Sequence, residues 1–524
     1  MVKIKSDDCT GYVEEKPKTL LFESLVFSAI PFLVIAIWCF YYRVDERLIV
    51  SGDENMEFAK AKMLGINGYD LKKMWNDQPW LYSYLLYAID WIGLPMHIVS
   101  RALTLFICWV FAATCSRVLE NWLAGWRAVF PGCIMAVVSQ MAPLMVSAMV
   151  ELPVQLGCAA VGLILITRRN RFFQNPILFG AIAGVALHFK FTAILPIFAS
   201  WVVLVFKKCP TWRLRFMIDS AISISICFSI LCYVGPHMHY SQLVSAHFGD
   251  LSIVGPVGLK QGIGFPIQFF GDLGLWVAAL VGLLELKANK DSQPVVLLIS
   301  VYALGSVVFS FFYRPYWGYY LVHTAVFLVP FASVGFSLFC DILKSNKCIL
   351  KSGVQLPGFR VQMNELAILT SLSLICGFTL GRAAYDVNAV LSSKTPSQDP
   401  LIGEITRSKK GDSMLYTSRP YYGYYCNISL IPEYVVPSFK NVAQNQLNSS
   451  NLLVLVRERS VDMLHVLRDV ELSDSSWIKY LNENCRLIYA GPSDELWIKD
   501  SKKLDFKKEN KTEFVDWRLK SIVW

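Results

Sequence analysis

Residues 20–42 read LLFESLVFSAIPFLVIAIWCFYY, and residues 43–57 continue as RVDERLIVSGDENME. The first stretch is close to the roughly 20 apolar residues that a helix needs to cross the hydrocarbon core of a bilayer. It is too long for the apolar region of a cleaved signal peptide, and it begins near Glu23 instead of ending in a small-residue cleavage site. We therefore expect the chain to keep this segment as its first membrane helix.

Apolar runs of similar length recur through the first three quarters of the chain. The 524 residues are 54% hydrophobic and 17% charged, with a mean hydropathy of +0.43, which is too apolar for an ordinary soluble chain. About eleven runs are long enough to cross a membrane. They lie near residues 20–42, 100–118, 128–149, 152–167, 174–189, 191–206, 214–235, 265–285, 294–312, 317–340 and 364–385. The sequence thus predicts a multi-pass α-helical membrane protein.

The formal net charge of +9 comes from short basic clusters between the apolar runs. Such clusters are topology signals and give no support to a nucleic-acid partner. They follow the N-terminus and the fourth, sixth and eighth runs, and all fall in the cytoplasm if every even-numbered run ends inside. The segments that then face outward are residues 43–99, the turns near 150 and 190, the loops 236–264 and 313–316, and everything after 385.

The character of the chain changes after about residue 386, where charged residues become frequent. Short apolar runs at 413–417, 452–456, 486–490 and 493–499 are typical of strands, and residues 459–469 of a helix. We expect residues 1–385 to form the transmembrane catalytic domain and 386–524 a small extracytoplasmic α/β domain. Cys426 and Cys485 lie in this tail, and the sequence leaves open whether they form a disulfide.

The first outward loop, residues 43–99, carries the candidate chemistry. Asp53 and Glu54 open an expected amphipathic helix directly after the first membrane helix, where acids also suit a helix start and can simply be solvated. The loop continues with Gly68-Tyr69 and with Trp75-Asn-Asp77-Gln78-Pro79-Trp80-Leu-Tyr82-Ser-Tyr84. Pro79 can start a second helix, whose aromatic residues would lie at the membrane interface.

These loop motifs resemble the first outer loop of membrane glycosyltransferases with the GT-C fold. The likeness is to the branch of protein O-mannosyltransferases, aminoarabinose transferases of lipid A and RgtA/B/C/D-like enzymes, which is glycosyltransferase family 39-like. In that branch an Asp-Glu pair follows the first helix, an acidic motif follows about two dozen residues on, and an Arg begins the next membrane helix. The matching positions here are Asp53-Glu54, Asp77-Gln78-Pro79 and Arg101.

Weaker similarities lie downstream. Glu151 falls where the family often has an acidic residue, and Lys190 falls at a turn where the family often has Lys-Gly-Pro, although the Gly-Pro is missing here. Arg314 belongs to an aromatic and basic entry into a later helix. Some relatives have Lys where this chain has Gln78. Because polar residues at membrane depth are costly, Glu151 and Lys190 need partners or a water-filled cavity, or else snorkel from a helix end.

The resemblance implies transfer of a sugar from a polyprenyl or dolichyl phosphate to an acceptor hydroxyl, with inversion and without a cofactor. Asp53 matches the general base and Glu54 is its neighbour, whereas Asp77, Gln78 and Glu151 would position donor or acceptor. A basic group must stabilise the departing lipid phosphate. The candidates are Lys190, Arg314, Arg101 and Lys260.

Two alternatives stay open. His237, His239 and His247 could hold zinc, although interfacial packing explains them as well. A transporter or flippase of a lipid-linked sugar would use the same basic and aromatic residues without needing Asp53 as a base, although the sequence has no visible internal repeat of the kind found in many transporters. We expect a bacterial inner (cell) membrane enzyme. Neither the sugar nor the acceptor, which could be a lipid, a glycan or a protein, can be read from the sequence.

Overall fold

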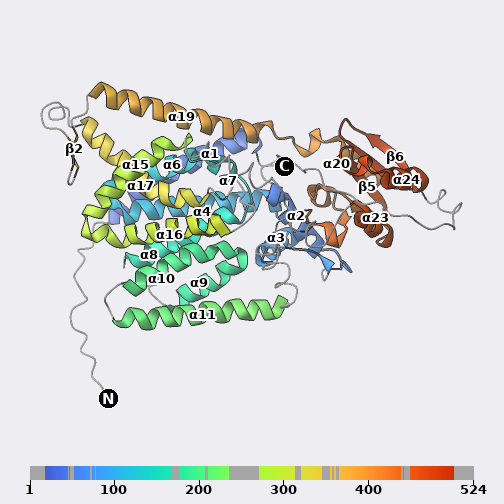
Figure 1. Ribbon diagram of the computed structural model, residues 1–524, viewed down its shortest axis with the longest axis horizontal. Coiled ribbons are helices and arrows are strands. Elements are labelled where there is room, and N and C mark those ends of the chain that lie inside the picture. The colour runs from blue at the N-terminus through green and yellow to red at the C-terminus, as the bar shows by residue number, and fades with distance from the viewer. Residues whose placement is uncertain are drawn as a thin grey trace, which may run out of the picture.

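The computed structural model describes most of the chain (Figure 1). The described residues are 18–44, 47, 52–70, 73–76, 78–167, 176–206, 210–234, 271–312, 320, 322–344, 354–356, 359–361, 365–437, 441 and 449–500. Six of the residues singled out in the sequence lie outside them, namely Asp77, Lys260, Arg314, His237, His239 and His247.

The chain is mostly α-helical, and its long helices form one bundle (Figure 1). The bundle helices are α1 (Lys18–Tyr41), α4 (Met96–Val118), α5 (Glu120–Leu123), α6 (Phe130–Val137), α7 (Met141–Met145), α8 (Glu151–Ile166), α9 (Pro176–Phe189), α10 (Ile194–Phe206), α11 (Pro210–Val234), α15 (Leu273–Ala288), α16 (Gln293–Phe312), α17 (Val322–Lys344) and α19 (Glu365–Ser392). Short 3₁₀ turns join several of them, among them η4 (Phe191–Ala193).

Among the described residues, four helical segments are long and apolar enough to cross a membrane. They are Phe22–Tyr41, Met96–Val118, Lys290–Phe309 and Val322–Asp341, and shorter apolar helices lie at Gly125–Val137, Glu151–Ile166, Leu178–Phe189, Phe191–Leu204 and Met217–Cys227. The class of multi-helix membrane protein is therefore confirmed. The count of about eleven crossings stays a prediction.

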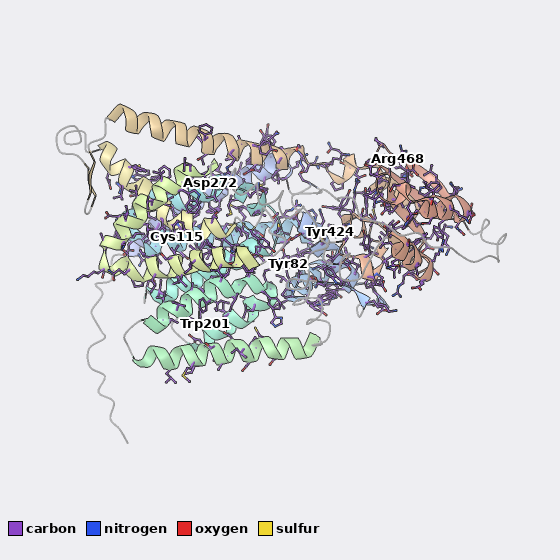
Figure 2. The ribbon with its side chains drawn as sticks, viewed as in Figure 1. Tyr82, Cys115, Trp201, Asp272, Tyr424 and Arg468 are labelled. Atoms are coloured by element: carbon purple, nitrogen blue, oxygen red, sulfur yellow. The ribbon has the colours of Figure 1, made fainter. Side chains whose placement is uncertain are left out.

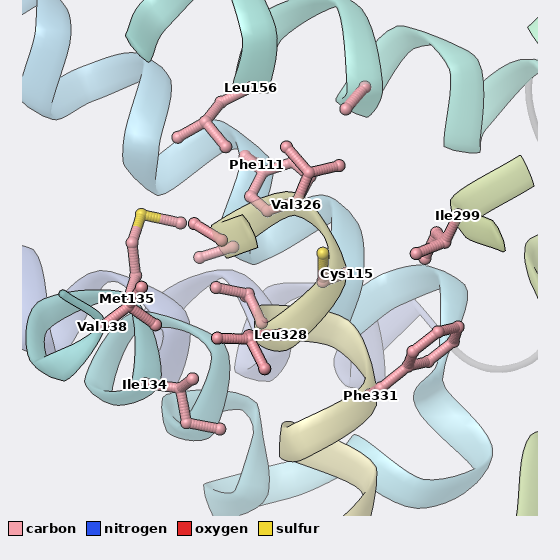
Figure 3. Packing of buried hydrophobic residues seen from close by; sticks show 14 of the residues in the cluster. Phe111, Cys115, Ile134, Met135, Val138, Leu156, Ile299, Val326, Leu328 and Phe331 are labelled. Carbon is pink, nitrogen blue, oxygen red and sulfur yellow. The ribbon is translucent and has the colours of Figure 1, made fainter. Parts of the chain in front are cut away.

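The core of the bundle is apolar and closely packed, as Figure 3 shows for side chains of α4, α6, α8, α16 and α17. Helices α15 and α17 approach one another closely at Gly282 and Gly335. A Cβ atom on Gly282 would overlap the carbonyl oxygen of Phe331, and one on Gly335 would overlap that of Ala278. Small residues that bring backbones together are the usual way for helices to associate in lipid, where apolar burial gives no net drive.

Two helices of the first loop lie at one end of the bundle, namely α2 (Gly52–Leu64) and α3 (Leu81–Trp91). Helix α2 is not the amphipathic surface helix that its sequence predicts. Three of its five charged residues, Glu54, Glu57 and Lys60, are buried, as is Phe58 among its apolar residues. The reason is that α2 packs against α3 on one side and against a helix of the C-terminal region on the other.

The C-terminal region contains a five-stranded mixed sheet with strand order β4-β3-β5-β7-β6. Strands β3 and β4, and β3 and β5, are parallel, whereas β7 pairs antiparallel with β5 and β6. The strands are β3 (Met414–Tyr416), β4 (Ser429–Leu430), β5 (Met463–Leu467), β6 (Cys485–Ala490) and β7 (Asp494–Lys499), and the helices around them are α20 (Pro400–Ser408), α21 (Tyr421–Tyr425), α23 (Ser449–Glu458) and α24 (Ser475–Asn484). A separate hairpin, β1 (Val354–Leu356) and β2 (Phe359–Val361), precedes α19.

Two of the expected elements of this region are wrong. Residues 452–456 belong to helix α23, and the expected helix at 459–469 contains strand β5. In α23 the buried residues are Leu452, Leu453 and Val456, a spacing that fits one face of a helix. Strand β5 is central and buried on both faces, so it lacks the alternation that identifies a strand.

Cys426 and Cys485 are not joined by a disulfide and lie buried in different apolar clusters. The cluster around Cys426 joins residues of the first loop, such as Met63 and Trp80, to residues of α20, α21 and the sheet. Hydrogen bonds cross the same boundary, for example from the Tyr69 hydroxyl to the Leu430 carbonyl at 2.8 Å. The C-terminal sheet thus docks on the first loop (Figure 1).

Candidate active site

The two carboxylates that open α2 have different environments. Glu54 is fully buried, and its carboxylate accepts two hydrogen bonds from Arg101 of α4, at 2.7 Å from Nε and 3.1 Å from Nη2. The Arg101 guanidinium also donates to the carbonyls of Val44 and Arg47, at 3.0 Å each. This bidentate pair fixes the start of α2 against α4 and against the end of the first helix.

Asp53 precedes this anchor and is only partly buried. It lies in the first turn of α2, where the unsatisfied backbone N–H groups favour a carboxylate. Since Glu54 is locked in place next to it, Asp53 sits on a rigid support. Of the two acids, Asp53 is the one whose exposure suits contact with a substrate.

A second buried network holds the loop between α2 and α3. Lys60 lies 2.6 Å from Glu57 and donates to the Asn76 side chain at 2.9 Å, and Ser83 donates to Glu57 at 2.8 Å. Asn76 also accepts from the backbone N–H of Gln78 at 3.1 Å. A buried ion pair such as Lys60–Glu57 is costly unless its remaining hydrogen-bonding groups are satisfied. Here three neutral groups take part, namely the Asn76 side chain, the Ser83 hydroxyl and the backbone N–H of Gln78. The network positions Gln78.

Gln78 leads to a third network at the ends of the membrane helices. Lys190 donates a short hydrogen bond to the Gln78 side chain, and its Nζ atom lies 3.6 Å from Oε2 of Glu151. Thr192 donates to Oε1 of the same carboxylate at 2.6 Å. Glu151 and Lys190 are 1% and 4% exposed, so each supplies the partner that the other needs at membrane depth.

Three further side chains complete this network, and sequence reasoning missed them. The Tyr302 hydroxyl lies 2.7 Å from Nδ1 of His323, and Nε2 of His323 lies 3.3 Å from Oε1 of Glu151. Gln155 contacts both Tyr302 and Glu151. The spacing of Gln155 from Glu151, one helical turn, was visible in the sequence. Nothing local points to Tyr302 or His323, which come from α16 and α17.

The short segment before α8 joins the Glu54–Arg101 pair to the network around Glu151. The backbone N–H of Ala148 donates to Oε1 of Glu54 at 2.9 Å, and its carbonyl accepts from the Tyr82 hydroxyl at 2.5 Å. Burial, and then the charges of Glu57 and Glu54, raise the pKa of Tyr82, so its hydroxyl stays protonated and can donate. Tyr82 lies between the bundle and the C-terminal sheet (Figure 2).

The C-terminal region adds a further support near α2. The hydroxyl of Tyr424 lies 2.8 Å from Nδ1 of His97, and the ring centroids of Tyr424 and Phe58 are 5.2 Å apart. Burial raises the pKa of Tyr424 to about 12, so this contact also involves a neutral phenol. Residues from the sheet region therefore hold the helix that carries Asp53.

The structure thus brings together several residues that the sequence singled out. Asp53, Glu54 and Arg101 form one group, and Gln78, Glu151 and Lys190 form another. Each guanidinium nitrogen of Arg101 binds a carboxylate or a backbone carbonyl, and its role as a lipid-phosphate ligand stays a prediction. Among the described residues, no group of three His, Cys, Asp or Glu side chains is arranged to hold a metal ion.

The arrangement offers a partly exposed carboxylate on a rigid helix start and a buried lysine at the same end of the bundle. The carboxylate can accept a proton, and the lysine can stabilise an anion. No family model and no curated protein matches the chain.

Two solved structures share the fold over most of their length. The crystal structure of ArnT from Cupriavidus metallidurans bound to undecaprenyl phosphate has a TM-score of 0.59 and 12% sequence identity, and the match covers 91% of this chain and 98% of that one. The apo state of the same protein has a TM-score of 0.57 and 14% identity, with the same coverage. The GT-C fold of aminoarabinose transferase, which the first loop implied, is confirmed for this chain.

Proposed function

We propose that the chain is a membrane glycosyltransferase that moves a sugar from a polyprenyl phosphate to an acceptor hydroxyl at the outer face of the membrane. One observation carries this proposal. Asp53 at the anchored start of α2 and Lys190 at the end of α9 lie at one end of a bundle whose fold is that of ArnT, a protein crystallised with undecaprenyl phosphate.

The proposed reaction is a single displacement. Asp53 takes the proton of the acceptor hydroxyl as the oxygen attacks the anomeric carbon. The new carbon–oxygen bond forms on the face opposite to the breaking bond, so the configuration inverts. The lipid phosphate departs as an anion, and Lys190 stabilises the charge that it gains. Arg314 and Lys260 remain further candidates for this task, and Asp77, Gln78 and Glu151 for positioning donor or acceptor.

In this proposal Arg101 is a structural partner of Glu54 and not a phosphate ligand. Its contacts to Glu54, Val44 and Arg47 support that role. Glu54 then acts on the reaction only by holding the helix turn that carries Asp53.

The proposed membrane arrangement has about eleven crossings, with residues 1–385 as the transmembrane domain and 386–524 outside the cytoplasm. The contacts between the first loop and the C-terminal sheet support a common side for both. The alternation of basic clusters makes that side the outer one, in a bacterial inner membrane.

The alternative is a transporter or flippase of a lipid-linked sugar. Such a protein would also need Lys190 and the aromatic loop, but it would break no glycosidic bond. The geometry of Asp53 suits the enzyme, because the attacking hydroxyl needs a proton acceptor that is held in place.

The experiment uses the purified protein in proteoliposomes with a panel of undecaprenyl-phosphate sugars, and measures release of undecaprenyl phosphate and movement of the lipid between leaflets. Asp53→Asn should lower release by about 10²–10⁴-fold while lipid binding and folding are preserved. Asp70→Asn, a carboxylate of the same loop that pairs with Lys73 at 3.2 Å, is the matched control and should retain turnover. Movement of lipid without release, unchanged by Asp53→Asn, would establish the flippase instead.

A further inference from the structure

Helix α21 brings a run of tyrosines from the C-terminal region to the first loop. It reads Tyr421-Tyr-Gly-Tyr-Tyr425, and it packs against α2. The hydroxyls of its first two tyrosines both donate to Oδ2 of Asp399, and the hydroxyl of Tyr424 lies 2.8 Å from Nδ1 of His97. These three phenols therefore have partners within the protein and hold the helix in place.

Tyr425 differs from the other tyrosines of this helix. Its hydroxyl oxygen is buried and has no hydrogen-bond partner among the described residues. The centroid of its ring is 4.7 Å from that of Tyr424 and 6.4 Å from that of the His97 imidazole. A buried hydroxyl of this kind has lost its hydrogen bonds to water without replacing them. Because that costs free energy, the hydroxyl of Tyr425 needs an explanation.

The hydroxyl of Tyr425 lies close enough to Arg101 and Glu54, the pair that anchors the start of α2, for both charges to act on it. Burial raises the pKa of Tyr425, the Arg101 charge opposes this effect and the Glu54 charge adds to it, so the hydroxyl stays protonated. Neither member of the pair forms a hydrogen bond with it. Tyr425 is thus a neutral donor beside the helix turn that carries Asp53.

We infer that Tyr425 donates a hydrogen bond to a hydroxyl group of the donor sugar, so that the C-terminal region completes the active site. The inference rests on the proposed function. In that reaction the anomeric carbon lies between the acceptor oxygen at Asp53 and the departing phosphate at Lys190, so the sugar ring occupies the space next to the first turn of α2. Ligand sites commonly combine aromatic walls with a few placed polar groups, and a tyrosine hydroxyl is one of these.

The exposure of Tyr425 agrees with contact to a ligand, because the residue as a whole is only partly buried. Its unmet hydroxyl also fits a site without substrate, since hydrogen bonds in active sites often form or tighten only when the substrate is bound. A site with such a donor discriminates against ligands that lack the matching acceptor, because the donor then stays unpaired. Tyr425 therefore selects for the sugar part of the lipid donor and not for its phosphate or its chain.

Binding to the purified full chain tests this inference, with the panel of undecaprenyl-phosphate sugars and with undecaprenyl phosphate itself as probes. Tyr425→Phe removes only the hydroxyl. It should weaken binding of the sugar lipid that binds the wild type most tightly by about three- to tenfold, the scale of one neutral hydrogen bond, and leave the binding of undecaprenyl phosphate unchanged. Equal effects on both lipids, or no effect on either, would overturn the inference. Lower transfer with unchanged binding of both lipids would also overturn it, because the contact would then be to the acceptor.

Tyr421→Phe is the matched control, because it is the same change in the same helix and its hydroxyl has a partner, Asp399, at 3.2 Å. It should leave the affinity ratio of the two lipids unchanged. Thermal unfolding without lipid gives a second readout. Tyr421→Phe should lower the unfolding temperature, whereas Tyr425→Phe should leave it unchanged or raise it, because the hydroxyl that it removes has no partner. If both variants lowered it equally, the Tyr425 hydroxyl would have a structural partner and the inference would be wrong.

Failure of the proposed function gives a different result from failure of this inference. A wild type that bound neither undecaprenyl phosphate nor any of its sugar derivatives would refute the proposed function, and the role of Tyr425 with it. A wild type that bound and transferred the sugar, with Tyr425→Phe matching it in both affinities, would refute only the role of Tyr425.

Discussion

Arg101 and Glu54 stand 47 positions apart in the sequence and meet in a buried bidentate ion pair, at 2.7 Å and 3.1 Å. The pair joins the first helix of the outer loop to the membrane bundle. Arg101→Ala should lower the free energy of unfolding by about 3–5 kcal/mol, because it leaves the Glu54 carboxylate buried without its partner. Chemical unfolding in detergent measures this loss. Arg407→Ala removes an exposed pair with Glu404 and should cost about 1 kcal/mol or less, so equal losses would contradict a structural role for Arg101.

Lys190→Ala should reduce kcat/KM for the lipid donor by about 10²–10³-fold, the scale for removing one group that stabilises developing negative charge. Arg314→Ala is expected to act in the same direction. The measurement is transfer from undecaprenyl-phosphate sugars, with expression and thermal stability as controls. Lys73→Ala, an exposed lysine of the first loop, is the matched variant and should retain activity. Efficient transfer from a soluble nucleotide sugar in the absence of lipid would refute the donor assignment.

The side of the membrane on which the C-terminal sheet lies can be tested by labelling with a membrane-impermeant maleimide on intact cells. Asp412→Cys is exposed in the sheet region and should be labelled, whereas Lys287→Cys follows an expected cytoplasmic helix end and should be labelled only after lysis. The labelling of each variant is compared with that of the unsubstituted protein, which contains cysteines of its own. Labelling of Lys287→Cys but not of Asp412→Cys in intact cells would reverse the orientation and move the proposed site to the cytoplasm.

Gly282→Ala should destabilise the bundle by about 1–3 kcal/mol, because the added methyl group meets the Phe331 backbone of α17, which cannot turn away as a side chain can. Thermal stability in detergent measures the effect. Gly381→Ala in α19 is the matched change, since a Cβ there meets nothing within 4 Å. It should be neutral or stabilising by up to about 1 kcal/mol. Equal destabilisation by both substitutions would argue against close packing at Gly282.

The C-terminal sheet should lose stability in acid through His465. Burial lowers the pKa of His465, with the Arg419 charge adding to the effect and Asp494 opposing it. The unfolded chain then binds the proton more tightly, so this stability is complete above a pH of about 6.5 and is lost as the pH falls below it. The unfolding temperature of the wild type should therefore fall more steeply on acidification than that of His465→Gln. Parallel curves would show that His465 does not control the acid response.

Hydropathy predicted the class of the fold, and local motifs predicted part of the candidate site. A run such as residues 20–42 marks a membrane helix whatever surrounds it, because the bilayer itself supplies the environment. The Asp53-Glu54 and Asp77-Gln78-Pro79 motifs identified the loop because their spacing is local. In the C-terminal region the expected strands at 413–417, 486–490 and 493–499 are confirmed, whereas the strand expected at 452–456 and the helix expected at 459–469 are wrong. Whether Leu452–Val456 and Met463–Leu467 form helix or strand depends on which faces their neighbours bury, and that is not encoded in the run itself.

The sequence by itself therefore determined that this chain is a helical membrane protein with an acidic first loop, since bilayer thickness and short-range spacing act on each segment separately. Only the tertiary structure decided what the charged residues do. Glu54 and Arg101 became an anchor, and Glu151 acquired Lys190, Tyr302 and His323 as neighbours, because four separate elements meet there. The state of a buried charge depends on the partners that exclude its water, and those partners come from distant parts of the chain.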